Sequence, residues 1–318
     1  MSPQSLGNTL IIANPAAHSG RGETAAIYVT RFFSSFNSIA SSCSVQLTER
    51  EGDACRMAED SVEYETVIAL GGDGIIHEVA NGLMKLPEPA RPRLGVIPVG
   101  TGNDFARTLG MRKNDPERAM SELLGGEERR LDIGRVNDTY FVQSLSFGLD
   151  AAIAQDTTRR RSSLGLQHGA SLYLTSGIRM LALDQYGWPY HARVEGDEGE
   201  ETLEGMGVAF AIQNGKTYGG GFKICPGAVP NDGFLDLCVS LEKPSRMHSL
   251  MLFGLIRMGR HTRSKKLLLR KIRHIEVEFV GKEQPPCQVD GEAFLSERYT
   301  IDVIPQALRV IVPPDCKW

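Results

Sequence analysis

A glycine-rich turn between an apolar strand and a helix constrains the fold of this chain most. Residues 67–70 read Val-Ile-Ala-Leu, which is typical of a buried parallel strand, and the Gly-Gly-Asp-Gly of residues 71–74 follows directly. Over residues 75–83 apolar side chains then recur at helical spacing. The order predicts a strand, a tight turn and the N-terminus of a helix.

This turn suits an anionic ligand. The first N–H groups of a helix lack intrahelical acceptors, and glycine has no Cβ to keep a phosphate away from the backbone. Asp73 is unusual in that setting, because a carboxylate repels a phosphate unless a cation lies between them or the carboxylate takes a proton from a hydroxyl. Both outcomes indicate phosphoryl transfer. From this turn alone, a βα turn in which Asp73 only caps the helix is an equal alternative.

Strand and helix patterns alternate through the first 100 residues. We expect strands at residues 10–13, 45–48, 67–70 and 93–98, and helices at residues 23–36 and 51–64. Such alternation predicts a parallel sheet. Because parallel strands end at one edge of the sheet, where ligands of open α/β folds bind, the loops after these strands are expected to meet there.

A second glycine turn supports that expectation. Residues 99–106 read Val-Gly-Thr-Gly-Asn-Asp-Phe-Ala and place Asp104 at the start of another helix. Residues 14–22 form a third, polar loop before a helix, in which His18, taken alone, is better explained as a solvated side chain. Two glycine turns with carboxylates at successive strand ends favour phosphate binding over two structural turns.

The length of 318 residues suits two domains. From residue 132 onward, β-type runs follow one another with glycine-rich connections, including residues 139–147, 300–303 and 308–312. This predicts an α/β domain with a parallel sheet over residues 1–132 and a mainly antiparallel β domain over residues 133–305. Residues 306–318 are expected to be able to pack back on the first domain.

Composition narrows the partners and the compartment. Lys and Arg number 35 against 39 Asp and Glu, and this net charge of −4 argues against a nucleic-acid partner. The six cysteines are scattered, and the first residues lack a signal-peptide pattern, so we expect a cytoplasmic protein. The most apolar segment, residues 250–259, is too short to span a bilayer.

Two motifs of the second domain place carboxylates beside glycines. Asp232 lies in a glycine- and proline-rich loop, and a carboxylate with loop carbonyls is how Mg²⁺ is held, although an Asn-Asp-Gly turn closing a hairpin fits equally well. Residues 288–292 place Asp290 and Glu292 around Gly291. Such a pair can act as a general base for a hydroxyl, but surface turns also carry acid pairs often.

A basic tract suggests a surface for membranes. Residues 243–275 contain ten Lys or Arg and no acid, and the first half of this tract is amphipathic. A basic face beside an apolar stripe suits an anionic membrane surface, to which each nearby cation adds about 1 kcal/mol. A solvated helix packed by its apolar side explains the pattern at least as well.

Taken together, these motifs resemble the diacylglycerol kinase catalytic-domain family, which includes bacterial soluble lipid kinases and sphingosine kinases. The matches come in the family's order and cover nearly the whole chain, at residues 14–15, 19–20, 71–74, 77–79, 81–83, 100–106, 131–134, 220–221, 231–233 and 290–292. The resemblance implies an N-terminal domain similar to that of NAD kinase and phosphofructokinase, and a C-terminal β-sandwich domain.

The resemblance also implies ATP and Mg²⁺ as cofactors and assigns site residues. The nucleotide would be held by Asn14, Ser19, Gly20, Thr48, Gly71, Gly72, Asp73, Gly74, Ile75, Ile76, His77, Thr101 and Asn103. Asp73, Asp104 and Asp132 would surround the catalytic Mg²⁺, and either Glu292 or Asp73 would accept the hydroxyl proton. A structural Mg²⁺ would use Val229, Asp232 and Phe234.

The implied activity is phosphorylation of a primary hydroxyl of a lipid, either diacylglycerol or a related lipid. Two alternatives stay open: a kinase of a soluble metabolite such as NAD or a polyol, and a non-catalytic nucleotide-binding protein. The expected partners are the lipid substrate and an anionic membrane surface, to which the cytoplasmic protein would attach peripherally. Whether the chain forms a homodimer is left open.

Overall fold

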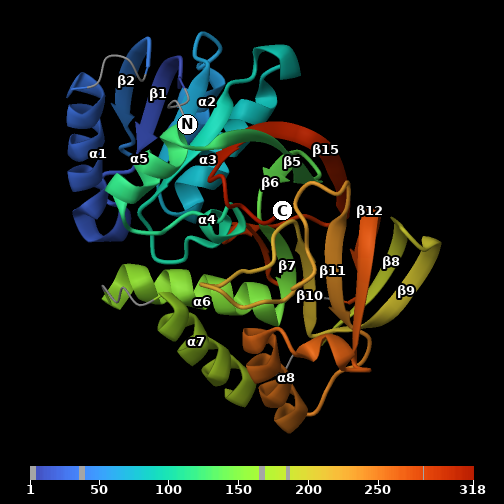
Figure 1. The fold of residues 1–318 in the computed structure, drawn as a ribbon. Helices are drawn as coiled ribbons and strands as arrows, with labels where there is room; N and C mark the ends of the chain where they lie inside the picture. The colour runs from blue at the N-terminus through green and yellow to red at the C-terminus, as the bar shows by residue number, and fades with distance from the viewer. Residues whose placement is uncertain (1–4, 36–39, 165–168, 184–186, 282) are drawn as a thin grey trace. The chain divides into compact units, whose positions relative to one another are not determined.

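A computed structural model describes residues 5–35, 40–164, 169–183, 187–281 and 283–318 (Figure 1). The chain divides into two compact units. Unit 1 consists of Met1–Leu131 together with Gln306–Trp318, and unit 2 consists of Asp132–Pro305.

Unit 1 is an α/β unit. Its elements are β1 (Asn8–Ala13), α1 (Ala17–Ser35), β2 (Ser42–Leu47), α2 (Asp53–Glu59), β3 (Thr66–Gly71), α3 (Asp73–Lys85), η1 (Glu88–Ala90), β4 (Arg93–Pro98), α4 (Asp104–Thr108), α5 (Pro116–Leu124) and the first part of β5 (Glu127–Val136).

The strands of unit 1 form a parallel sheet in the order β2-β1-β3-β4. Every residue of β3 is buried, and β1 and β4 are buried apart from their first residues, as expected for strands with helices on both faces. The end of β15 (Tyr299–Val312) adds to this sheet beside β4, with Val310 opposite Leu94 in parallel register. The predicted parallel α/β fold is confirmed.

The predicted helix bounds in unit 1 need correction. The span of α1 starts at Ala17, but His18, Ser19 and Gly20 have non-helical backbone angles, so the regular part of the helix follows Gly20, close to its predicted start at residue 23. Its predicted last residue, 36, lies outside the described residues. α2 ends at Glu59 instead of reaching residue 64, and the chain turns at Ser61, whose hydroxyl donates to the Ala58 carbonyl at 2.5 Å.

Unit 2 is mainly antiparallel. It contains the end of β5 and β6 (Thr139–Phe141), β7 (Ser144–Gly148), α6 (Leu149–Leu164), α7 (Gly169–Leu183), β8 (Trp188–Gly196), β9 (Gly199–Gly207), β10 (Ala209–Gln213), β11 (Leu235–Ser240), α8 (Arg246–Met258), η2 (His261–Arg263), β12 (Leu267–Phe279), β13 (Cys287–Val289), β14 (Glu292–Phe294) and the first part of β15.

The strands of unit 2 pair in the order β14-β13-β7-β10-β11-β12-β15, and β12 also pairs with the β8–β9 hairpin. β12 pairs with β11 over residues 267–272 and with β15 over residues 274–277, while its pairing with β8 over residues 272–279 contains a register shift between Ile272 and His274. An aromatic cluster fills the core, with the ring of Phe147 centred 4.6 Å from that of Tyr299 and 5.4 Å from that of Phe210. The predicted antiparallel β domain is confirmed.

Two helices and two strand arrangements in unit 2 differ from expectation. α6 and α7, which lie next to α8 in Figure 1, were not predicted from the sequence, and a second core forms where these helices pack on β10 and β11. The predicted strands at residues 300–303 and 308–312 are one continuous strand, β15, in which the left-handed Gln306 makes a bend. The run at residues 139–147 is two strands, β6 and β7. No helix in the described part of the chain is long and apolar enough to cross a membrane.

Candidate active site

Loops that follow four strands lie side by side at the carboxyl edge of the unit 1 sheet. Thr48, just after β2, donates its N–H to the Ala13 carbonyl at the end of β1 over 2.9 Å. Asn14, just after β1, donates its N–H to the Leu70 carbonyl of β3 over 3.0 Å. These bonds tie the residues that follow successive strands into one rim.

The two glycine turns touch each other on this rim. The N–H of Val99 donates to the Gly71 carbonyl over 2.8 Å. A Cβ built on Gly100 would lie 2.5 Å from the Gly72 Cα, closer than real Cβ contacts come. Gly71 itself has a φ of 153°, which L residues rarely adopt. Glycine is therefore required for the two turns to approach so closely.

The carboxylates of Asp73 and Asp104 lie on either side of Gly102. Asp73 is the first residue of α3, and its Oδ1 accepts the N–H of Phe105 at the start of α4 over 3.2 Å. A Cβ on Gly102 would lie 2.6 Å from Asp73 Oδ2 and 3.6 Å from Asp104 Oδ2. Asp104 is buried and pairs with Arg107 at 2.7 Å. The bare backbone of Gly102 thus leaves space next to two acids.

Asn103 holds the second turn in shape. It is fully buried in the left-handed region, with a φ of 52°, and its Nδ2 donates to the Gly100 carbonyl over 2.8 Å. Its Oδ1 is buried without a hydrogen-bond partner among the described residues. Thr101, which lies between Gly100 and Gly102, is half-buried.

The loop after β1 has an unusual backbone. Asn14 Oδ1 accepts the N–H of Ala16 over 3.0 Å, and His18, Ser19 and Gly20 then follow with φ values of 47°, 59° and 85°. Ser19 and Gly20 are exposed, whereas His18 is half-buried and its Nδ1 has no partner in the described part of the chain. Burial and the nearby Arg21 lower the pKa of His18. Its expected setting as a solvated loop residue is therefore only partly met.

Within α3, the predicted nucleotide residues face different surroundings. Ile75 and Ile76 are buried in the core, and the Ile76 N–H donates to the Gly72 carbonyl over 3.4 Å, so their side chains are not placed to contact a ligand. His77 is half-buried, and its carbonyl accepts the Asn81 amide over 2.9 Å. Glu78 has a structural contact, because its Oε2 accepts the Ala54 N–H in the first turn of α2 over 3.0 Å.

In unit 2, Asp132 is completely buried and bonded to the loop that contains Asp232. The Asp132 N–H donates to the Pro230 carbonyl over 2.8 Å, and its Oδ2 accepts the Gly233 N–H over 2.7 Å. The Asn214 amide donates to the Asp132 carbonyl over 2.7 Å. The loop and the start of unit 2 are therefore one hydrogen-bonded assembly.

The turn at Asp232 is occupied by protein groups. Its Oδ1 accepts the Phe234 N–H over 3.1 Å, and its N–H approaches the Val229 carbonyl at 3.4 Å. The Lys271 ammonium pairs with its Oδ2. No group of three or more His, Cys, Asp or Glu in the described ranges is arranged to hold a metal ion.

The Asp290–Gly291 dipeptide is a tight turn between β13 and β14. Both residues have positive φ, 49° and 98°, as a two-residue hairpin of this type requires. The buried Asp290 carboxylate accepts the N–H groups of Val142, Gln143 and Ser144 at 2.8–2.9 Å. Glu292 is exposed at the start of β14. The two acids therefore differ in role, because three backbone hydrogen bonds already hold the Asp290 carboxylate.

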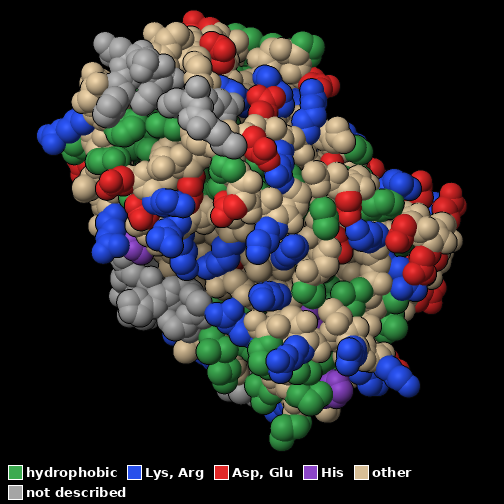
Figure 2. Space-filling model, viewed as in Figure 1, with side chains coloured by type: hydrophobic (Ala, Val, Ile, Leu, Met, Phe, Trp, Pro, Cys, Tyr) green, Lys and Arg blue, Asp and Glu red, His purple; other side chains and the backbone are tan. Residues whose placement is uncertain are grey.

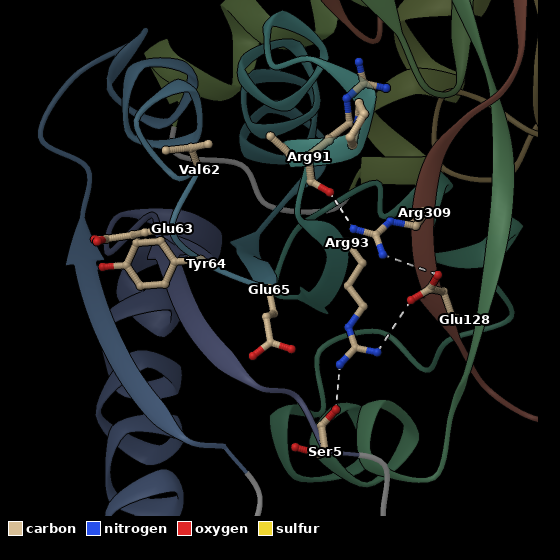
Figure 3. A pocket seen from close by; sticks show the side chains of 11 residues that line it. Ser5, Val62, Glu63, Tyr64, Glu65, Arg91, Arg93, Glu128 and Arg309 are labelled. Carbon is tan, nitrogen blue, oxygen red and sulfur yellow. Dashed lines mark hydrogen bonds and ion pairs between the residues drawn. The ribbon is translucent and has the colours of Figure 1, made fainter.

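A pocket of about 490 Å³ lies in unit 1, at the opposite, amino edge of the sheet (Figure 3). Arg93 donates to the Ser5 carbonyl at 2.6 Å and lies 3.6 Å from Glu128, while Arg309 donates to the Arg91 carbonyl at 2.6 Å. The Arg93 and Arg309 side chains of this pocket thus contact protein acceptors. The pocket lies at the amino ends of β3 and β4, whereas the glycine turns follow the carboxyl ends of these strands.

The fold and the candidate site together indicate a class of enzyme. Glycine turns at helix N-termini, with carboxylates between them on the carboxyl edge of a parallel sheet, are the arrangement of an enzyme that handles phosphate groups. The diacylglycerol kinase catalytic domain matches residues 8–136, and the YegS C-terminal NAD kinase beta sandwich-like domain matches residues 143–312.

The chain belongs to the diacylglycerol kinase catalytic-domain family and is a lipid kinase, which confirms the resemblance predicted from its motifs. It is 32% identical to the "Diacylglycerol kinase" of Bacillus subtilis (strain 168) over 89% of this chain and 88% of that protein. It is 30% identical to a "Probable lipid kinase YegS-like" of Enterobacter sp. (strain 638), over 86% and 87%. A crystal structure of a diacylglycerol kinase from Bacillus anthracis str. Sterne has the same fold, with a TM-score of 0.72, 20% identity and 98% of both chains covered.

Proposed function

We propose that this lipid kinase transfers the γ-phosphoryl group of ATP, in the presence of Mg²⁺, to a primary hydroxyl of diacylglycerol or a closely related lipid. The observation that carries the proposal is the pair of carboxylates, Asp73 and Asp104, beside the bare backbone of Gly102. The Bacillus subtilis relative is named for diacylglycerol, which supports that substrate class. Unit 1 would bind the nucleotide and unit 2 the lipid.

The glycine turns fit a nucleotide phosphate tail. Each turn leads into the N-terminus of a helix, α3 or α4, and no side chain stands at Gly72, Gly74, Gly100 or Gly102. The loop that holds Asn14, Ser19 and Gly20 would line the same rim as Thr48. A methyl group at position 102 would come too close to the Asp73 carboxylate, so glycine is what lets this carboxylate lie against the second turn, near Asp104.

Mg²⁺ fits the acids of this rim, because carboxylates are ligands that this cation prefers. Mg²⁺ supplies positive charge between carboxylates and phosphate oxygens when it is bound. Asp73 and Asp104 of unit 1 would hold it. Positioning and charge neutralisation then account for most of the catalysis of phosphoryl transfer.

We assign the proton acceptor to Glu292 rather than to Asp73. Glu292 is exposed beside a rigid hairpin turn, where a hydroxyl can approach its carboxylate from solvent, and the Asp73 carboxylate helps to join the two glycine turns by accepting the Phe105 N–H. The other acid of the hairpin, Asp290, is less suited to this role, because its carboxylate accepts the backbone N–H groups of residues 142–144. Glu292 would take the proton of the lipid hydroxyl as the oxygen attacks phosphorus.

The enzyme would reach its substrate by attaching peripherally to an anionic membrane from the cytoplasm. α8 buries Leu252, Phe253 and Ile256 but also exposes apolar side chains on its other face, with Met247 78% and Met251 52% exposed. The packed-helix alternative therefore accounts for one face of α8 only. Exposed cations near this stripe are Arg246, Arg257, Arg260, Arg263 and Lys265.

Figure 2 shows this region as green apolar side chains with blue Lys and Arg side chains among and around them, in the part of the view where Figure 1 places α8. The mixture suits the boundary between lipid headgroups and acyl chains. Only the first half of the basic tract is helical, however, since residues 267–275 belong to β12.

A turnover assay with the purified chain tests the proposal. With ATP and Mg²⁺, ADP release should rise when mixed micelles containing diacylglycerol are added, and mass spectrometry should find the phosphorylated lipid. Turnover of NAD or glycerol without turnover of lipid would replace the lipid by a soluble substrate. ATP binding without ADP release from any of these acceptors would leave a nucleotide-binding protein.

A further inference from the structure

In unit 2, the turn that contains Asp232 has a cationic side chain, Lys271, paired with its carboxylate. Lys271 lies on β12, where it is opposite Asp236 of β11 in antiparallel register. Its ammonium group is paired with the Asp232 carboxylate, and the two side chains are only 35% and 24% exposed. An ion pair with this degree of burial is specific to its place in the sheet, unlike the mobile pairs of an open surface.

The protein groups around Asp232 leave little for a metal ion to bind. One carboxylate oxygen accepts the Phe234 N–H, the other faces Lys271, and the Val229 carbonyl faces the Asp232 N–H. Mg²⁺ needs an octahedron of oxygen ligands. The donor set predicted for a structural Mg²⁺ therefore does not fit this turn as it stands.

Positive charge also surrounds the turn from the side of β12. The guanidinium of Arg273 lies 4.1 Å from the centre of the Phe234 ring, and the Lys271 ammonium lies 5.8 Å from the same ring. Both cations are held against the aromatic face next to Asp232. A divalent ion at this carboxylate would have to displace or repel them.

We propose that the Lys271 ammonium takes the place of a divalent cation at the turn of residues 229–234. The turn then closes on a cation that is part of the chain, and it needs no metal to fold. This inference does not rest on the proposed phosphoryl transfer, because it concerns the folding of one loop in the absence of nucleotide.

The presence of Lys271 in place of a metal ion has a consequence for Asp132. The same turn donates the Gly233 N–H to Asp132 Oδ2 and accepts the Asp132 N–H at Pro230. Lys271 thus acts on Asp132 through Asp232 and the turn, which makes it a positioning residue. Since Asp132 is fully buried, its orientation depends on this loop.

Thermal unfolding without nucleotide tests the proposal. The difference between the unfolding temperatures in EDTA and in millimolar Mg²⁺ should be the same in the wild type and in Asp232→Asn. Lys271→Met should unfold several degrees lower in EDTA and regain much of the loss in Mg²⁺, because the vacated carboxylate can then accept the metal. Lys271→Arg, which keeps the charge, should behave like the wild type. A wild-type rise with Mg²⁺ that Asp232→Asn abolishes would overturn the proposal.

A second measurement keeps the proposal testable if Lys271→Met does not fold. Electron paramagnetic resonance counts bound Mn²⁺ in the nucleotide-free wild type, in Asp232→Asn and in Asp73→Asn. We expect the same number of bound ions in the wild type and in Asp232→Asn. One Mn²⁺ fewer in Asp232→Asn, with no such loss in Asp73→Asn, would place a metal at the turn and refute the role of Lys271.

Discussion

The backbone N–H of Phe105 donates to the carboxylate of Asp73 over 3.2 Å and joins the start of α4 to the start of α3. Asp73 thereby belongs to two glycine turns at once, although 30 residues lie between it and Asp104 in the sequence. A residue in this position affects both structure and chemistry. Variants of the site must therefore be compared for stability as well as for turnover.

Replacing Asp73 with Asn should abolish most activity while the fold persists. The amide oxygen can still accept the Phe105 N–H, but the negative charge toward Mg²⁺ is lost. We expect turnover to fall by about 100- to 1000-fold, the usual loss when one such electrostatic group is removed. ADP release measures the effect, and Asp60→Asn, an exposed carboxylate in unit 1, is the control. Unchanged turnover would remove Asp73 from the mechanism.

Gly102→Ala should weaken nucleotide binding. The new methyl group would lie 2.6 Å from Asp73 Oδ2, so it would displace this carboxylate from the second glycine turn, which is proposed to bind the phosphates. We expect the KM for ATP to rise by about tenfold, which corresponds to roughly 1.4 kcal/mol. Gly227→Ala is a matched control, because its Cβ would meet nothing within 4 Å. Equal KM values in the two variants would show that position 102 does not contact the nucleotide.

The two acids of the β13–β14 hairpin should respond in opposite ways. Asp290→Asn should lower the free energy of unfolding by about 2 kcal/mol, because a charged acceptor of buried N–H groups is lost. Glu292→Gln should leave stability unchanged but reduce turnover by about 100-fold or more. Chemical denaturation and ADP release separate the effects. A stable, active Glu292→Gln enzyme would instead favour Asp73 as the proton acceptor.

Asp150 should make the stability of unit 2 depend on pH. Burial raises the pKa of this carboxyl to about 6 from its ordinary 3.8, and one of its oxygens lacks a partner among the described residues. Because the folded-state pKa lies above the unfolded one, the protonated carboxyl stabilises the fold at low pH. This contribution is lost as the pH rises from about 4 through about 6.

Asp150→Asn should remove that dependence. Relative to the wild type, the variant should gain stability as the pH increases, by roughly 3 kcal/mol at most above pH 7. Thermal unfolding at a series of pH values measures the difference, with the exposed Asp138→Asn as the control. A constant difference between Asp150→Asn and wild type across this range would show that Asp150 titrates normally.

The exposed face of α8 should determine membrane binding. Exchanging Met247 and Met251 for Ser removes much of the apolar stripe without touching the buried face of the helix. Sedimentation with vesicles that contain phosphatidylglycerol should recover several-fold less of this variant, while activity on short-chain lipid in micelles persists. Val280→Ser, an exposed apolar residue elsewhere in unit 2, should bind like the wild type. Binding that ignores anionic lipid would contradict the docking role.

Sequence patterns predicted the fold of unit 1 well because its strands are buried on both faces. β3 and β4 read as unbroken apolar runs, and their glycine turns are local features. α6 was missed because its apolar positions are few and its sequence from Gln155 onward is polar, so the helical period is weak. The tertiary core formed with β10 and β11 stabilises it instead.

The sequence predicted the candidate site only where local motifs and the topology of a parallel sheet determine which residues meet. Parallel strands place Asn14, Thr48, Asp73 and Asp104 on one rim by topology, and the sequence implied this. The contrast between Asp290 and Glu292 depends on residues 142–144, which only the folded chain brings to the hairpin. Lys271 lies 39 residues from Asp232, and no short motif links them.

The β15 strand runs from unit 2 into unit 1, where it covers β4. On a ribosome, residues 306–318 emerge after both units have otherwise been synthesised. Until these residues are made, the β4 edge of the unit 1 sheet is unpaired. Such an edge can pair with strands of other chains and lead to misassembly. Completion of the unit 1 sheet is thereby coupled to synthesis of unit 2.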